Sequence, residues 1–270
     1  MCNDGRYGYP HVHDPDRILG ARYRSDSKTK ELDFTGLSDR LREDFRGAGG
    51  TLGAVLSPFL TVEEAYLLAT TIREIDGNAV LAIGPVPVVG EDEQFPGGFA
   101  ISAEKCPNRL GVEAILADFT GGVMTFGDFV AKVDDGAIAA AWISGGYRDP
   151  WIEESTAEKL GNLKTLVVQD LFPSPLSKRA TYEIGGAAFP ERDGSYVNRQ
   201  HRIQSVSWAI RPPAGNRTEG SLLWEFSGGK GLYDAASVLQ ELARKIPAFS
   251  AAMGGAIPDI GIDLRLNQLA

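Results

Sequence analysis

Short apolar runs alternate with helical segments between residues 51 and 170, and this alternation constrains the fold more than any other feature of the sequence. Four runs have the length and residue types of buried strands: TLGAVLSP (51–58), NAVLAIG (78–84), AIAAAWISGG (137–146) and TLVVQD (165–170). Helices are predicted at 61–75, 111–119, 126–136 and 153–160. Because crossovers between parallel strands are right-handed, the pattern predicts a mainly parallel sheet with helices on both faces, which a strand near 180–188 would extend.

The helix at 61–75 carries the clearest local signal. Thr61-Val-Glu-Glu64 has the sequence of a capping box, in which Thr61 accepts from the backbone and Glu64 reaches back. Apolar residues follow at helical spacing, at Val62, Ala65, Tyr66, Ala69 and Ile72. The expected fold class is therefore α/β, with a Rossmann-like sheet.

Polarity and predicted secondary structure divide the chain into three segments. Residues 1–50 are polar and read as irregular, residues 51–226 as the α/β domain, and residues 227–270 as a C-terminal helix and tail. From about 189 a turn-rich stretch predicts a hairpin-like excursion, followed by helices at 219–226 and 232–246. Pro247 should end the second helix, and the last twenty residues, rich in Gly and Ala, are expected to be loosely attached.

Charge and composition exclude several classes of function. The formal net charge is −9 and the basic residues are scattered, so we expect no nucleic-acid partner. The apolar run at 79–89 contains Gly and Pro and is too short for a membrane span, so direct membrane insertion is not expected. The chain has two cysteines, Cys2 and Cys106, no Cys-x-x-Cys and no signal peptide, which favours a cytoplasmic protein without a structural disulfide.

The ends of the predicted strands are the first candidate site, because open α/β sheets bind ligands beyond their carboxyl ends. Small or polar residues stand there: Ser57-Pro58, Gly84-Pro85, Ser144-Gly145-Gly146 and Gln169-Asp170. Such residues let a ligand approach the backbone, but a strand also needs them simply to turn. No Gly-x-Gly-x-x-Gly motif follows a strand, so a dinucleotide fingerprint is missing.

Other candidate groups are weaker. His11, His13, Asp14 and Asp16 could hold a metal ion, although a polar turn is the commoner reason for such a cluster. His201 stands alone downstream, and no Gly-x-Ser-x-Gly motif is present. The residues by themselves therefore indicate no catalytic constellation.

Two separated segments resemble a known superfamily. They are MCNDGRYGY (1–9) with DPDR (14–17), and GAAFPERDGSYVN (186–198) with Arg202 and Gln204. These stretches resemble the molybdopterin oxidoreductase superfamily, and look most like a truncated form of its G-subunit branch in NADH-quinone oxidoreductase (respiratory complex I). EKCPNRLGVEAIL (104–116) is similar to a further family segment. Catalytic members are several hundred residues longer, so the resemblance implies a domain that lacks much of the full-length fold.

The resemblance assigns expected roles to individual residues. In relatives, the cysteine that matches Cys2 is the last of four ligands to a [4Fe–4S] cluster, and Cys2 alone cannot complete such a site. The pterin-contacting positions of the family map to Gly194, Ser195, Asn198, Arg202 and Gln204. In this chain we interpret them as maintaining the fold, with Gly194 in an unusual backbone conformation and Asn198 and Arg202 as buried hydrogen-bonding anchors. We therefore expect no cofactor in this chain alone, whereas catalytic relatives hold molybdopterin.

Three functions follow as hypotheses. The first is a largely structural, non-catalytic domain of a G-subunit-like protein, cytoplasmic and peripheral to the inner membrane through the other subunits of a respiratory NADH-quinone oxidoreductase. The second is a molybdopterin-binding oxidoreductase fragment, similar to formate dehydrogenase. The third is a mononucleotide-binding module that uses the strand ends and would be stabilised by its ligand, although the missing glycine fingerprint weighs against it.

Overall fold

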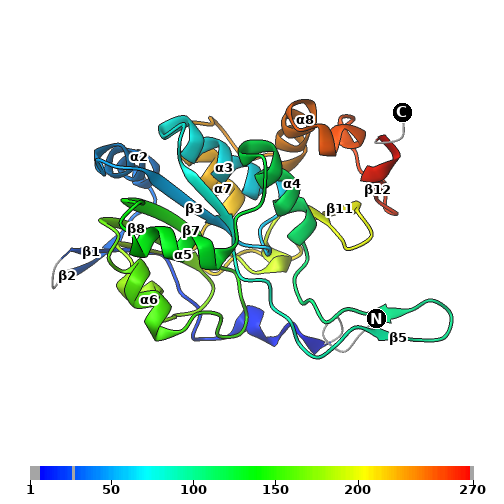
Figure 1. Ribbon diagram of the computed structural model, residues 1–270, viewed down its shortest axis with the longest axis horizontal. Helices are drawn as coiled ribbons and strands as arrows, with labels where there is room; N and C mark the ends of the chain where they lie inside the picture. The colour runs from blue at the N-terminus through cyan, green and yellow to red at the C-terminus, as the bar shows by residue number, and fades with distance from the viewer. Residues whose placement is uncertain (1–6, 26–27, 268–270) are drawn as a thin grey trace.

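A seven-stranded sheet forms the centre of the protein in the computed structural model, which describes residues 7–25 and 28–267 (Figure 1). The strands lie in the order β2-β1-β9-β8-β7-β3-β4. Their bounds are β1 Ala21–Ser25, β2 Lys28–Leu32, β3 Leu52–Leu56, β4 Val80–Ile83, β7 Ala140–Ser144, β8 Thr165–Asp170 and β9 Tyr182–Gly185. Neighbours from β9 to β4 pair in parallel, whereas β1 pairs antiparallel with both β2 and β9. The predicted α/β class with a mainly parallel sheet is confirmed.

Helices cover both faces of this sheet, as the alternation predicts. One hydrophobic cluster joins the strands to α2 Leu37–Gly47, α3 Val62–Ile75, α4 Arg109–Thr120, α7 Glu219–Phe226 and α8 Ala235–Lys245. A second cluster joins the opposite face to α5 Phe126–Asp134 and α6 Glu154–Leu160. Strand side chains point alternately to the two clusters; Val167 belongs to the first and its neighbour Val168 to the second.

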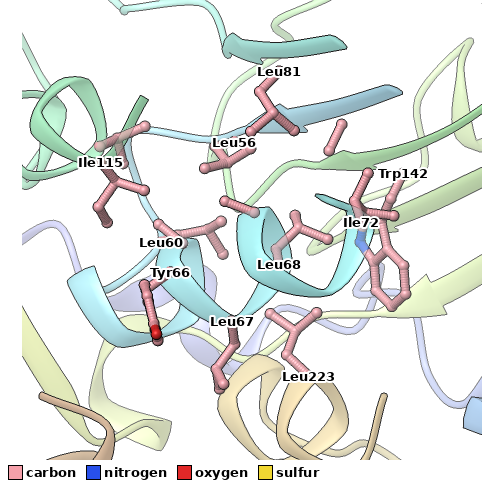
Figure 2. Close-up of a cluster of buried hydrophobic side chains, with 14 of the residues drawn as sticks. Leu56, Leu60, Tyr66, Leu67, Leu68, Ile72, Leu81, Ile115, Trp142 and Leu223 are labelled. Carbon is pink, nitrogen blue, oxygen red and sulfur yellow. The ribbon is translucent and has the colours of Figure 1, made fainter. Parts of the chain in front are cut away.

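Helix α3 is the centre of the larger cluster. Figure 2 shows Leu68 and Ile72 of this helix among Leu56, Trp142 and Leu223, which come from two strands and from α7. The capping box predicted at its start is present. The Thr61 hydroxyl oxygen accepts from the Glu64 amide at 3.2 Å, and the Glu64 carboxylate accepts from the Thr61 amide at 2.9 Å.

The first fifty residues are more regular than the sequence predicts, and this expectation is wrong for residues 21–47. The hairpin β1–β2 extends the central sheet through the pairing of Ala21 with Ile184, and α2 follows it. Charged residues alternate with others along the hairpin, so it shows no apolar run. Helix α2 begins after Gly36, which has φ of 73° and offers no side-chain cap.

The hairpin predicted after residue 189 is present as β10 Gly194–Val197 and β11 Arg202–Val206. Helix α8 ends at Lys245, before Pro247, as expected. The tail is not loosely attached, however. The 3₁₀-helix η4 Pro247–Ala252 buries Phe249 completely, and β12 Ile262–Asp263 pairs with β11 before the 3₁₀-helix η5 Leu264–Asn267. This pairing joins residues about sixty positions apart, so no local pattern announces it.

A two-stranded arm extends from the body between β4 and α4 (Figure 1). It contains β5 Glu93–Gln94 and β6 Ala100–Ile101, which pair antiparallel. Three further 3₁₀-helices are η1 Pro10–His13, η2 Ser177–Arg179 and η3 Phe189–Glu191. Among the described parts of the chain, no helix has the length and apolar character needed to cross a membrane.

Candidate functional site

A cavity of about 950 Å³ opens at the carboxyl ends of the parallel strands, where the sequence predicts a ligand crevice. Its lining includes Phe59 after β3, Pro85 after β4, Gly146 after β7, Leu171 after β8 and Ala187 after β9. The chain runs outward from β3 to β4 and then returns to β7 on the other side of β3. This reversal of strand order is where open α/β sheets bind ligands.

Three aromatic rings form one wall of the cavity. The ring of Phe59 meets Tyr147 edge-on at 5.0 Å, and Tyr147 stacks on Trp151 at 4.8 Å between centroids. The Tyr147 hydroxyl donates to the Pro85 carbonyl at 2.8 Å. This hydrogen bond and the two ring contacts together fix the orientation of the Tyr147 side chain. Sequence reasoning missed these residues, although the segment GGYRDPW (145–151) directly after a predicted strand could have indicated them.

Asp170, at the end of β8, holds the loop that carries this wall. Its carboxylate accepts from the Gly146 amide at 2.8 Å and from the Trp151 indole nitrogen at 2.8 Å. Burial raises the pKa of Asp170 to about 6, although these donors oppose the shift. A side chain on Gly145 would place its Cβ 2.2 Å from the Asp170 carboxyl group. Asp170 is therefore a fixed internal support beneath the loop, and it is not among the cavity-lining residues.

Two further residues named in the sequence analysis, His11 and Cys106, line the rim of the cavity, whereas His13, Asp14, Asp16 and His201 are not among its lining residues. His11 Nδ1 donates to the Gly8 carbonyl at 2.6 Å, and burial lowers the pKa of His11. The Cys106 thiol donates to Glu104 at 3.4 Å, and burial raises the pKa of this thiol to about 12. Within residues 7–25 and 28–267, no three His, Cys, Asp or Glu side chains are grouped to hold a metal ion. The segment from His11 to Asp16 forms the end of the 3₁₀-helix η1 and the loop that follows it.

Arg192 lines the same cavity and is the centre of a buried ionic cluster. Its guanidinium donates to Glu64 at 3.0 Å, to Glu219 at 3.1 Å and to the Ala187 carbonyl. A further bond of 3.3 Å reaches the Phe59 carbonyl. Burial lowers the pKa of Arg192, but the two carboxylates raise it by more. The cluster ties the starts of α3 and α7 to the cavity wall.

Gly194 and Ser195, two of the five positions mapped to the pterin loop, pack against α3. The Ser195 hydroxyl and amide both donate to Glu63, at 2.7 and 2.8 Å. Burial raises the pKa of Glu63 to about 7. Gly194 has φ of 155°, and a Cβ at this position would lie 2.6 Å from Thr61 side-chain carbons. The unusual backbone expected at Gly194 is present.

The other three positions organise the β10–β11 turn and its neighbour β12. The Asn198 side chain accepts from the Arg202 amide at 3.1 Å and donates to Gln204 at 3.1 Å. Arg202 donates to the Gly261 carbonyl at 2.9 Å. Asn198 and Arg202 are half-buried, so the expectation that both are buried is wrong. They belong to the β10–β11 hairpin, and only the short strand β12 pairs with β11 on its outer side. All five mapped positions lie outside the cavity lining.

The two cofactors implied by the superfamily, an iron–sulfur cluster and a pterin, fit poorly at the residues that the resemblance assigns to them. Cys2 lies outside the described residues, and the chain has only one other cysteine, whose thiol faces Glu104. Four thiolates for a [4Fe–4S] cluster are therefore not available within this chain. For a pterin, the mapped loop positions bond to the protein itself, whereas the strand-end cavity is of the size that cofactor sites usually have.

Comparison with known proteins gives partial relatives, and no family model matches the chain. Subunit alpha of the NADPH-Fe(3+) oxidoreductase of Geobacter sulfurreducens is 27% identical over 138 residues, covering 47% of this chain and 16% of the relative. Subunit alpha of F420-dependent formate dehydrogenase 1 of Methanococcus maripaludis is 29% identical over 110 residues, covering 38% of this chain and 16% of the relative. Subunit alpha of the F420-dependent formate dehydrogenase of Methanocaldococcus jannaschii is 37% identical over 54 residues, covering 20% of this chain and 8% of the relative.

These relatives are alpha subunits of oxidoreductases, which supports the resemblance to the molybdopterin oxidoreductase superfamily. None of the three is a complex I subunit. The chain spans less than a fifth of the length of each of these three relatives.

Proposed function

We propose that the chain is a largely structural α/β domain of a multi-subunit oxidoreductase, similar to the G-subunit branch of NADH-quinone oxidoreductase. It would support electron transfer from NADH to quinone without catalysing a step itself. Its partners would be the other subunits, which would hold it on the cytoplasmic side of the inner membrane.

One observation carries this proposal. The polar atoms of the signature loop are bound within the domain: Ser195 to Glu63, Asn198 to the β10–β11 turn, and Arg202 to the Gly261 carbonyl. Side chains used in this way stabilise a fold and leave few donors for a cofactor. The names of the alpha-subunit relatives support a place in an oxidoreductase assembly.

A second candidate is a molybdopterin-binding fragment similar to formate dehydrogenase, which two of the three relatives described above favour by name. The cavity at the reversal of strand order is the feature of this chain that favours it. In that case the cavity residues around Tyr147 and Arg192, rather than Gly194 to Gln204, would contact the group. The group would supply the redox chemistry, and the chain would bind and orient it.

Metal analysis of the purified chain separates the two candidates. The protein would be produced anaerobically in a host that makes molybdopterin, and iron, sulfide and molybdenum would be measured per mole, together with the visible spectrum. Folded, colourless protein without stoichiometric molybdenum agrees with the structural role. Stoichiometric molybdenum would overturn it in favour of the second candidate.

A matched pair of variants controls for iron. If iron is retained, Cys2→Ser should release it and Cys106→Ser should not, since the Cys106 thiol is held protonated beside Glu104. Iron retained by the Cys2→Ser protein is adventitious.

A further inference from the structure

Tyr196 of β10 is one of the residues that line the strand-end cavity. Side chains alternate between the two faces of a strand, and Ser195 uses the opposite face to reach Glu63. Tyr196 is half-buried and lines the cavity together with the buried Arg192. Burial holds the pKa of the Tyr196 hydroxyl well above its usual range, against the lowering effect of Arg192. The hydroxyl therefore remains a hydrogen-bond donor throughout the physiological pH range.

The charges behind Tyr196 are unbalanced. Three carboxyl groups, Glu63, Glu64 and Glu219, and one guanidinium, that of Arg192, act on the Tyr196 hydroxyl. When all four groups are ionised, two negative charges are in excess. Arg192 is already bound to two of the carboxylates, and its Nε–H has no partner among the described residues. The guanidinium therefore cannot act as a receptor for an additional anion without a large repulsion from the carboxylates.

Other charged groups near this end of the cavity do not reverse the net negative charge of the carboxyl cluster. Burial, and then the charges of Glu63, Glu64 and Asp193, hold the pKa of Tyr233 well above its usual range, so neither Tyr233 nor Asp193 adds positive charge here. At the rim, the Lys105 ammonium donates to the Ser102 carbonyl at 2.8 Å and Arg148 pairs with Asp149 at 3.0 Å. Burial lowers the pKa of His11, so that imidazole is neutral at pH 8. The remaining rim carboxylate, Glu104, pairs with Arg109.

From this geometry we propose that the cavity binds an uncharged aromatic molecule whose acceptor oxygen receives a hydrogen bond from Tyr196, and that the carboxyl cluster excludes anions. The wall of Phe59, Tyr147 and Trp151 supplies the contact for the aromatic ring. This site rests on the cavity alone and does not depend on the oxidoreductase role proposed above.

Benzamide and benzoate test the proposal, because they have nearly the same shape and differ in charge. Titrations followed by ligand-observed NMR at pH 8 should give saturable binding of benzamide, with benzoate at least about tenfold weaker. Between pH 8 and pH 5.5 the difference should shrink at least about threefold, because burial raises the pKa of both Glu63 and Glu219 to about 7 and both take up a proton as the pH falls. Absence of saturable benzamide binding, or equal affinity for benzoate at pH 8, would overturn the proposal.

Variants assign the hydrogen bond. Tyr196→Phe removes only the hydroxyl and should weaken benzamide binding about fivefold. Tyr66→Phe is the matched control, because its hydroxyl contacts Glu241 on α8 and not the cavity. Both variants would first be compared with the wild type by circular dichroism. Unchanged benzamide affinity in a folded Tyr196→Phe protein would show that Tyr196 does not select the ligand. Molybdenum content, which tests the proposed function, does not enter this measurement.

Discussion

Replacing Glu63 with glutamine should stabilise the protein at pH 8 and have much less effect at pH 4.5. The Glu63 side chain is 1% exposed, and its carboxylate accepts the amide and hydroxyl protons of Ser195. Burial raises the pKa of Glu63 from 4.5 to about 7. The folded state therefore binds this proton more tightly than the unfolded state, so the associated stability is present below about pH 4.5 and is lost as the pH rises to about 7.

The size of the effect follows from that shift. One pH unit corresponds to about 1.36 kcal/mol, so ionised Glu63 costs the folded state about 3 kcal/mol at pH 8. Glutamine cannot ionise, and its amide can keep both bonds by accepting from the Ser195 amide and donating to the Ser195 hydroxyl. The Glu63→Gln protein should thus be more stable than the wild type by up to about 3 kcal/mol at pH 8.

Urea unfolding at pH 4.5 and pH 8 measures this difference, with the two proteins compared at each pH. The exposed Glu74 lies on the same helix, so Glu74→Gln is the control and should change stability by less than about 0.5 kcal/mol at either pH. The reasoning is refuted if Glu63→Gln has the same effect at both pH values, because a pH-independent change would come from packing rather than from the buried charge.

Two further substitutions test the supports of the cavity. Gly145→Ala would place a methyl group 2.2 Å from the Asp170 carboxyl group and should destabilise the protein by about 2 kcal/mol or more in urea unfolding. Gly122→Ala, where nothing lies within 4 Å, should cost little, and equal losses would contradict the steric argument. Arg192→Met would leave the buried carboxylate of Glu64 without its guanidinium and should cost about 3–5 kcal/mol at pH 8. Burial raises the pKa of Glu219, the second carboxyl group on Arg192, to about 7, so its charge is present at pH 8 and lost at pH 5, and the loss in stability should be smaller at pH 5 in thermal unfolding.

The order of strands and helices between residues 51 and 170 was predictable because its causes are local. Thr61 and Glu64 are three residues apart, and the apolar runs of β3 and β8 are buried on both faces. Such patterns record which side of an element faces the core. The hairpin β1–β2 was missed because its charged residues lie at a sheet edge, where little apolar surface is buried.

The position of the candidate site was also predictable, since strand ends in an open α/β sheet converge at one edge. The identity of the residues that line the site was not predictable. Asp170 was grouped with the possible ligand contacts, yet it supports the loop from below. The only sequence signal for the aromatic wall was the segment after β7 that contains Tyr147 and Trp151, and the signature around Arg192 did not show that this side chain reaches the cavity. The role of Arg192 follows from its contacts with Glu64 and Glu219, which lie far from one another in sequence.

The sequence by itself determined the fold class, the helical and strand segments of the central domain, and the edge of the sheet where a cavity lies. Tertiary structure alone decided which polar residues face that cavity and which are used internally. Ser195 and Tyr196 are neighbours, but one bonds to Glu63 and the other lines the cavity. The physical reason is that local periodicity reports burial, whereas the identity of a partner 132 residues away depends on how the whole chain closes.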